Sequence, residues 1–204
     1  MTGKPRATAK PPRRTHERGA QSRRLRIIAG HWKGRRWQFP EAGIRPTSDR
    51  IRETLFNWLQ GRIAGRRCLD LYAGSGALGL EALSRGAAHC VFVDRNAQAI
   101  ANLGDVLREW GASSTSAELV QAPAEQYLAG GTRSFDLVFL DPPFAGNALA
   151  DVVLQLRERG ALAPGCLLYL EHPRSAVLPA LPPGFAALRE GRAGAVGYDL
   201  YEYR

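Results

Sequence analysis

Residues 69–79 read Leu-Asp-Leu-Tyr-Ala-Gly-Ser-Gly-Ala-Leu-Gly and decide the fold. A short apolar strand leads into a glycine-rich turn, and the apolar pattern beyond it predicts a helix. Gly74, Gly76 and Gly79 have the spacing G-x-G-x-x-G, which permits a tight turn and close approach of a ligand to the backbone. The stretch therefore predicts a loop for a nucleotide-type cofactor, with dinucleotides and S-adenosylmethionine both still open.

Strands and helices alternate through residues 67–142, which predicts a parallel sheet with helices on both faces. Ligands bind such sheets at the carboxyl ends of the strands, where Asp70, Asp94 and Asp141 are expected to lie. Five strands are predicted at 68–72, 90–94, 118–122, 135–141 and 166–171. Two further strands, at 185–189 and 198–203, are predicted to form a closing hairpin.

Two acidic positions narrow the kind of cofactor and substrate. Asp94 lies 20 residues after Gly74, where a carboxylate accepts hydrogen bonds from a ribose diol of either cofactor. Residues 141–144 read Asp-Pro-Pro-Phe. A carboxylate and a proline-fixed carbonyl can hold both N–H bonds of an exocyclic amine, and the aromatic ring can stack on a base that has left its stack. A nicotinamide enzyme has no use for that turn, so an amino methyltransferase is favoured.

The first quarter of the chain is strongly basic. Residues 1–52 hold 15 of the 28 Lys and Arg residues and three of the 19 acidic residues, whereas the remainder is mildly acidic. This asymmetry indicates a nucleic-acid partner, with a solubilising tail as the alternative. Residues 1–24 carry almost nothing to bury and are expected to be disordered.

A β-hairpin is predicted from residues 26–30 and 35–39, and a helix begins after an N-cap at Thr47 or Ser48. Trp32, Trp37 and Phe39 either stack on bases or anchor the hairpin to the core, and anchoring is favoured for the last two.

The remaining patterns exclude other classes of protein. Cys68, Cys90 and Cys166 have no metal-binding or disulfide spacing and are expected to be buried, so we expect no metal site. No apolar run is long enough to span a membrane, and no secretory signal begins the chain. We therefore expect a cytoplasmic protein with no membrane partner.

The sequence resembles the RsmD family of bacterial 16S rRNA guanine-N2 methyltransferases, which use S-adenosylmethionine. The resemblance covers residues 25–204 and is carried by four stretches, at residues 26–30, 45–57, 69–85 and 141–144. It implies a Rossmann-like class I methyltransferase fold, with a seven-stranded, mostly parallel sheet, helices on both faces and an N-terminal β-hairpin extension. It divides the chain into a disordered basic tail (1–24), an rRNA-binding arm of hairpin and helix (25–60) and a methyltransferase domain (61–204).

The resemblance also implies roles for individual residues. The target amine is expected at Asp141, Pro142, Pro143 and Phe144. The cofactor is expected at Asp70, Tyr72, Ala73, Gly74, Ser75, Gly76, Asp94, Ala122 and Ala124. The RNA contacts are expected from Arg26, Lys33, Arg35, Arg36, Arg45, Thr47, Arg50 and Arg52. The family often has an acid for the adenine amine where this chain has Pro123, so backbone groups or Glu125 must replace it.

The expected partner is 16S rRNA within a 30S subunit or an assembly intermediate, bound by a monomer. Two alternatives stay open on the sequence. One is an amino methyltransferase that acts on DNA adenine or another rRNA base, and the other is a non-enzymatic, RNA-binding factor of ribosome assembly.

Overall fold

The computed structural model describes residues 22–40, 47–131, 133–142, 147–176, 178 and 180–204. Its main feature is a sheet with the strand order β5-β4-β3-β6-β7-β9-β8. These strands are β3 (Arg67–Asp70), β4 (His89–Asp94), β5 (Ala117–Gln121), β6 (Phe135–Leu140), β7 (Leu162–Pro173), β8 (Phe185–Ala193) and β9 (Val196–Tyr203). A separate antiparallel hairpin consists of β1 (Ser22–Arg26) and β2 (Arg36–Pro40).

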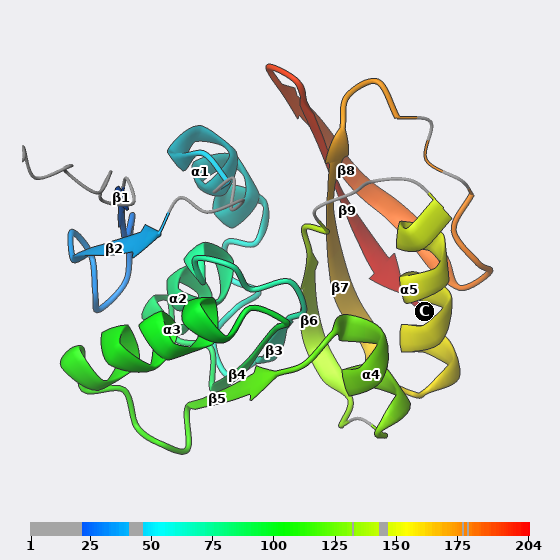
Figure 1. Cartoon of the computed structure of the whole chain (residues 1–204). Helices are drawn as coiled ribbons and strands as arrows, with labels where there is room; N and C mark the ends of the chain where they lie inside the picture. The colour runs from blue at the N-terminus through cyan, green and yellow to red at the C-terminus, as the bar shows by residue number, and fades with distance from the viewer. Residues whose placement is uncertain (1–21, 41–46, 132, 143–146, 177, 179) are drawn as a thin grey trace, which may run out of the picture.

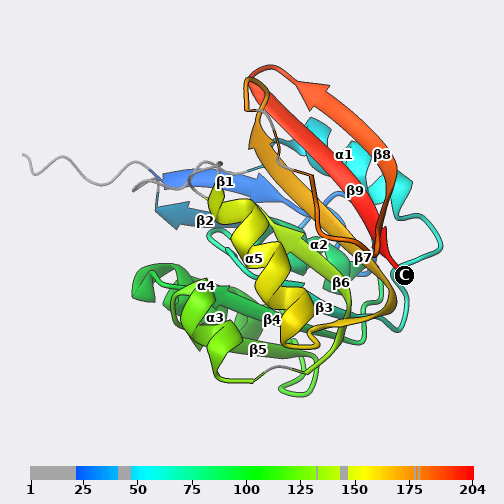
Figure 2. The same cartoon turned by 90° about the vertical axis from the view of Figure 1, so that its right-hand side faces the viewer.

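Helices cover both faces of the sheet, as Figures 1 and 2 show. The helices are α1 (Asp49–Trp58), α2 (Ala77–Ser84), α3 (Ala97–Glu109), α4 (Ala124–Ala129) and α5 (Asn147–Glu158). One hydrophobic cluster joins the hairpin, α1, α2 and α3 to the sheet, and a second joins α4 and α5 to its other face. Strands β3 to β7 are parallel, and β9 runs antiparallel between β7 and β8. The predicted fold class is therefore confirmed.

Successive side chains along a strand point to opposite faces of the sheet and therefore belong alternately to the two hydrophobic clusters. In β6, Leu137 and Phe139 face the first cluster, whereas Val138 and Leu140 face the second. A strand buried on both faces has to be apolar throughout, which is why these segments read as continuous apolar runs. The three cysteines are free and buried, as predicted.

The N-terminal hairpin differs from the prediction in its first strand. Strand β1 begins at Ser22 rather than Arg26, because Arg24 pairs with Gln38 and Leu25 with Trp37 across the hairpin. Residues 22–24 therefore belong to the hairpin and not to the basic tail. The apolar pair Ile27 and Ile28, which suggested a strand, follows the end of β1 and precedes the turn, and Ile27 is buried in the first cluster.

The helix that follows the hairpin begins as predicted. Ser48 is the N-cap of α1, and its Oγ accepts a hydrogen bond from the N–H of Ile51 at 3.3 Å. In the described part of the chain, no helix is both long and apolar enough to cross a membrane.

Gly79 allows α2 to pack closely against the sheet. A Cβ atom at this position would lie 2.3 Å from the Phe92 ring and 2.8 Å from Cys90 Sγ. We expect Gly79→Ala to lower the free energy of unfolding by about 1–3 kcal/mol, because the overpacked strand must move. Urea denaturation measures the change. Gly130→Ala, where the Cβ makes ordinary contacts, is the matched control, and equal stabilities of the two variants would contradict the packing role.

Candidate active site

Three aspartates lie together at the carboxyl edge of the central strands. Asp70 ends β3, Asp94 ends β4, and Asp141 directly follows β6. Because β3 pairs with both β4 and β6, the three strand ends are neighbours. The structure therefore brings these residues to one edge, as the alternating pattern predicted.

Asp94 is fastened to the glycine loop. Its Oδ2 accepts a hydrogen bond from the N–H of Gly74 at 2.7 Å, and its Oδ1 accepts one from the N–H of Asn96 at 2.8 Å. Each carboxylate oxygen can accept more than one hydrogen bond, so both can still accept from a diol. Gly74 and Gly76 have positive φ angles of 49° and 74°, which glycine adopts without strain. The loop and this carboxylate thus fit the ribose of a nucleoside cofactor.

Asp70 is buried between the strand end and the first turn of α2. Its Oδ2 accepts a hydrogen bond from the N–H of Gly79 at 3.0 Å. Burial raises the pKa of Asp70 to about 7, and the negative charges of Asp94 and Glu171 add to this effect, whereas the Gly79 hydrogen bond opposes it. A cation next to Asp70 favours its ionised form, so this position suits a positively charged ligand group.

The expected adenine region lies where β5 meets α4. The N–H of Ala122 donates to the Asp94 carbonyl at 3.1 Å, so that N–H is engaged within the protein. Pro123 is the N-cap of α4 and provides no side-chain hydrogen bond, and Ala124 is buried. Burial raises the pKa of Tyr72 to about 12, and the negative charge of Glu125 adds to this effect.

The turn expected to hold the target amine is described at its first two residues. Asp141 and Pro142 are half-buried at the end of β6, whereas Pro143 and Phe144 lie outside the described residues. The next strand adds a carboxylate that sequence reasoning did not select, Glu171 of β7. It is 4% exposed and accepts a hydrogen bond from the Tyr169 hydroxyl at 2.9 Å. A glutamate at the carboxyl end of an apolar strand was the available signal.

The basic residues expected to contact RNA separate into two groups. Arg26, Lys33, Arg35, Arg36 and Arg50 are exposed on the hairpin and at the start of α1. Arg45 lies outside the described residues.

Thr47 and Arg52 do not belong to that exposed surface. Thr47 is 6% exposed and Arg52 is 0% exposed, which corrects the expectation that they grip RNA. The Arg52 guanidinium instead donates to the Arg26 carbonyl at 2.9 Å and pairs with Asp49 at 2.6 Å and Glu81 at 3.5 Å. A guanidinium without exposed surface can hold elements of the fold together but cannot reach a phosphate in solution.

Glu81 of α2 is the centre of that buried network. Its carboxylate accepts hydrogen bonds from the backbone N–H groups of Ile28 at 2.8 Å and Ala29 at 3.0 Å. Ser84, one turn further along α2, donates to the Ala29 carbonyl at 2.6 Å. The helix that follows the glycine loop therefore holds the turn of the hairpin directly.

The aromatic residues of the hairpin anchor it to the core. Trp32, Trp37 and Phe39 are each 5% exposed or less, so the open alternative of base stacking is excluded for all three. The Trp37 indole N–H donates to the Ser75 carbonyl of the glycine loop at 2.9 Å. The exposed basic hairpin and the loop are thus joined by a hydrogen bond between residues 38 positions apart.

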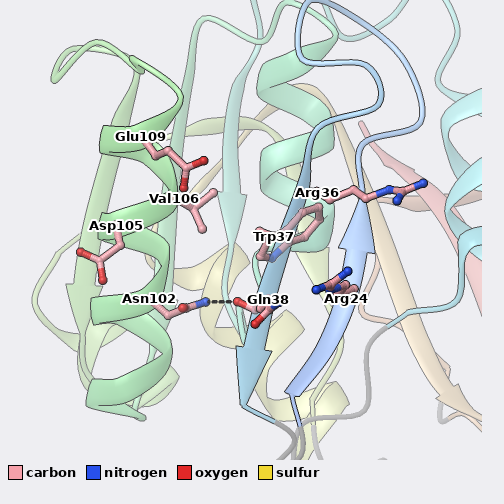
Figure 3. A pocket seen from close by; sticks show the side chains of 8 residues that line it. All are labelled: Arg24, Arg36, Trp37, Gln38, Asn102, Asp105, Val106 and Glu109. Carbon is pink, nitrogen blue, oxygen red and sulfur yellow. Dashed lines mark hydrogen bonds between the residues drawn. The ribbon is translucent and has the colours of Figure 1, made fainter.

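A cavity of about 380 Å³ lies between β2 and α3, and none of the three aspartates lines it (Figure 3). Asn102 closes one side of it, because its side-chain N–H donates to the Gln38 carbonyl at 2.9 Å. The cavity includes none of the residues expected to hold the cofactor. The strand ends, where the acidic and backbone groups converge, therefore locate the candidate site better than this hollow does.

The sheet order is that of a Rossmann-like fold, and together with the relatives described next it places the chain among the methyltransferases. Residues 25–202 match the family model described as conserved hypothetical protein 95, and the chain belongs to that family. This confirms the resemblance to the RsmD family. The chain is 41% identical to ribosomal RNA small subunit methyltransferase D of Escherichia coli K12, over 89% of this chain and 91% of the relative.

Other relatives agree. The protein of the same name from Haemophilus influenzae is 39% identical over 87% of this chain and 93% of its own length. The solved structure of a putative methyltransferase from Escherichia coli superposes with a TM-score of 0.82 at 39% identity, and the match covers 88% of this chain and 98% of that chain.

Proposed function

We propose that this chain transfers a methyl group from S-adenosylmethionine to the exocyclic N2 amine of one guanine in 16S rRNA. The observation that carries the proposal is the position of Asp141 and Pro142, which follow β6 beside the strand that leads into the glycine loop. The relatives named ribosomal RNA small subunit methyltransferase D support the choice of RNA.

The residues of the chain act mainly by positioning. When bound, S-adenosylmethionine supplies a methyl group on a positively charged sulfur. The Asp141 carboxylate and the Pro142 carbonyl accept the two N–H bonds of the amine and orient its lone pair. In the transfer the methyl group would pass from sulfur to nitrogen, so that the C–S bond breaks as the N–C bond forms, and the proton that the nitrogen loses would pass to the Asp141 carboxylate and then to solvent. Asp94 holds the ribose, and the backbone of residues 74–76 lines the methionine part, so effective concentration supplies much of the rate.

The exposed basic hairpin grips the RNA. Arg26, Lys33, Arg35, Arg36 and Arg50 provide a sequence-independent electrostatic contact with phosphates. Because α2 and the glycine loop hold the hairpin, the RNA contact is fixed relative to the methyl donor. The protein acts as a monomer in the cytoplasm, on a 30S subunit or an assembly intermediate.

Tritiated methyl transfer tests this function. Purified protein and labelled S-adenosylmethionine are incubated with 16S rRNA, 30S particles and genomic DNA from a strain that lacks the protein. We expect label in rRNA or 30S particles and none in DNA. Label in DNA alone would contradict the proposal and indicate a DNA methyltransferase. The absence of both label and cofactor binding would favour a non-enzymatic assembly factor.

The raised pKa of Asp70 predicts a pH dependence of cofactor affinity. If the ionised carboxylate attracts the ammonium of the cofactor, binding must displace a proton below pH 7. We therefore expect the affinity for S-adenosylhomocysteine to fall by up to about tenfold per pH unit below roughly pH 7, and Asp70→Asn to abolish this dependence. Calorimetry between about pH 5.5 and pH 8.5 measures it, and parallel pH profiles of the two proteins would contradict the role.

The raised pKa of Asp70 also affects the stability of the fold, which is expected to be higher at low pH, whereas cofactor affinity is expected to be lower there. A folded-state pKa of about 7, above the ordinary value of 3.8, means that the folded protein binds this proton more tightly than the unfolded chain. The stabilising contribution is complete below about pH 3.8 and is lost as the pH rises through 7. Asp70→Asn is therefore expected to be more stable than the wild type at pH 8.

A further inference from the structure

We propose that Glu171 selects guanine over adenine by accepting a hydrogen bond from the N1–H of the target base. This inference rests on the proposed function and adds a specificity-determining residue to it. The carboxyl group lies next to the turn that holds the target amine, but on a different strand.

The register of the sheet places Glu171 beside Asp141. Leu140 of β6 pairs with Leu170 of β7 in a parallel ladder, and the two acids are the residues that directly follow this pair. Figure 1 shows β6 and β7 side by side. Parallel strands carry successive partners to the same edge, so both acids lie at the carboxyl edge where the target base is expected.

The same face of the sheet carries both side chains. Phe139 and Tyr169 belong to the cluster on the hairpin side, and side chains two residues apart on a strand share a face. The Tyr169 hydroxyl reaches Glu171 at 2.9 Å, which confirms this face for the glutamate. The charge of Asp141 also contributes to the raised pKa of Tyr169, so it lies within electrostatic range of that hydroxyl. The two carboxylates therefore border one region.

Tyr169 holds the glutamate in place. Its ring is 0% exposed and contacts the rings of Phe139 and Tyr198. Burial and the charge of Glu171 raise its pKa well above the ordinary value, so the hydroxyl remains a hydrogen-bond donor across the physiological range. A carboxylate can accept several hydrogen bonds at once, so the tyrosine contact is compatible with a bond to a base.

Guanine and adenine differ in the hydrogen-bonding group at N1, which a carboxylate at the position of Glu171 can distinguish. In guanine, the N1–H and the N2 amine are adjacent donors on one edge. If Asp141 and Pro142 accept from the amine, the adjacent donor needs an acceptor next to that turn, where Glu171 lies. Adenine has a lone pair at N1, which a carboxylate repels. Sites built to accept from a substrate N–H discriminate strongly against analogues that lack it.

2-Aminopurine separates reading of N1 from binding of the amine, because it keeps the N2 amine but has a lone pair at N1. The position of the methylated nucleotide is first located with the wild-type protein. The substrates are then 30S particles that carry either guanine or 2-aminopurine at that position. We expect the wild type to prefer guanine by roughly tenfold to hundredfold in kcat/KM, the range of one charged hydrogen bond. Glu171→Gln is expected to remove most of this preference, because an amide can donate to N1 of 2-aminopurine.

Two further variants complete the experiment. Tyr169→Phe keeps the ring but loses the hydroxyl, and we expect an intermediate preference. Glu158→Gln, an exposed glutamate at the end of α5, is expected to leave the preference unchanged. If Glu171 only supports the fold, Glu171→Gln lowers the activities on the guanine and the 2-aminopurine substrates equally. An unchanged preference for guanine in this variant therefore overturns the inference. Absence of guanine methylation by the wild type would instead overturn the proposed function, and the inference with it.

Discussion

Asp141→Ala is expected to abolish methyl transfer while leaving the cofactor site intact. Asp141 follows β6, whereas the glycine loop follows β3 and Asp94 ends β4, so the substitution is expected to leave the hydrogen bond between Asp94 and the glycine loop in place. Without the carboxylate, the amine lone pair is no longer oriented toward the methyl group. Loss of one such positioning or electrostatic contact typically costs about 10²–10³-fold in kcat.

The measurement combines label transfer to 30S particles with calorimetry of S-adenosylhomocysteine. We expect transfer near background and a dissociation constant within about threefold of the wild type, which is less than 1 kcal/mol. Asp151→Ala, an exposed aspartate on α5, is the control. Full transfer by Asp141→Ala would show that another group orients the amine, and loss of cofactor binding would place Asp141 in the cofactor site instead.

Arg52→Met is expected to lower the free energy of unfolding by about 3–5 kcal/mol, the usual cost of removing one partner of a buried ion pair. Arg52 and Glu81 are both 0% exposed, and the substitution removes one of two guanidinium partners of the glutamate, which keeps its ion pair with Arg85 at 2.8 Å. The Arg26 carbonyl also loses its donor. The turn of the hairpin, which rests on Glu81, is expected to loosen together with α1.

Urea denaturation of Arg52→Met and Arg50→Met provides a matched comparison, because Arg50 is exposed on the same helix and its loss is expected to change stability by less than about 0.5 kcal/mol. RNA affinity provides the converse comparison, because Arg50 is proposed to bind RNA whereas Arg52 is proposed to stabilise the fold. Arg50→Met is expected to weaken RNA binding at unchanged stability. Equal stabilities of the two variants would contradict the buried network.

Local patterns in the sequence were sufficient for the architecture and for the edge where the site lies. The glycine spacing and the aspartates at strand ends depend on neighbours within a few residues, and the alternation of strands and helices determines where those ends meet. The N-cap at Ser48 is likewise local. These features were predicted because tertiary contacts reinforce the preferences that the chain already has.

Long-range partners could not be predicted from the sequence. Arginine is rarely buried, and Arg52 is buried because Glu81, 29 residues away, meets it inside the fold. Trp37 and Ser75 are similarly distant, so nothing local indicates that the hairpin touches the glycine loop. Ile27 and Ile28 suggested a strand by composition, whereas the pairing of Leu25 with Trp37 places the strand earlier.

The chemical identity of the methylated nucleoside tests the proposed activity most directly. rRNA from 30S particles of a strain that lacks the protein, treated with the purified protein and S-adenosylmethionine, is digested to nucleosides and analysed by mass spectrometry. We expect N2-methylguanosine to appear at a single position of 16S rRNA. Methylated adenosine or cytidine as the product would contradict the assignment of guanine N2 as the acceptor.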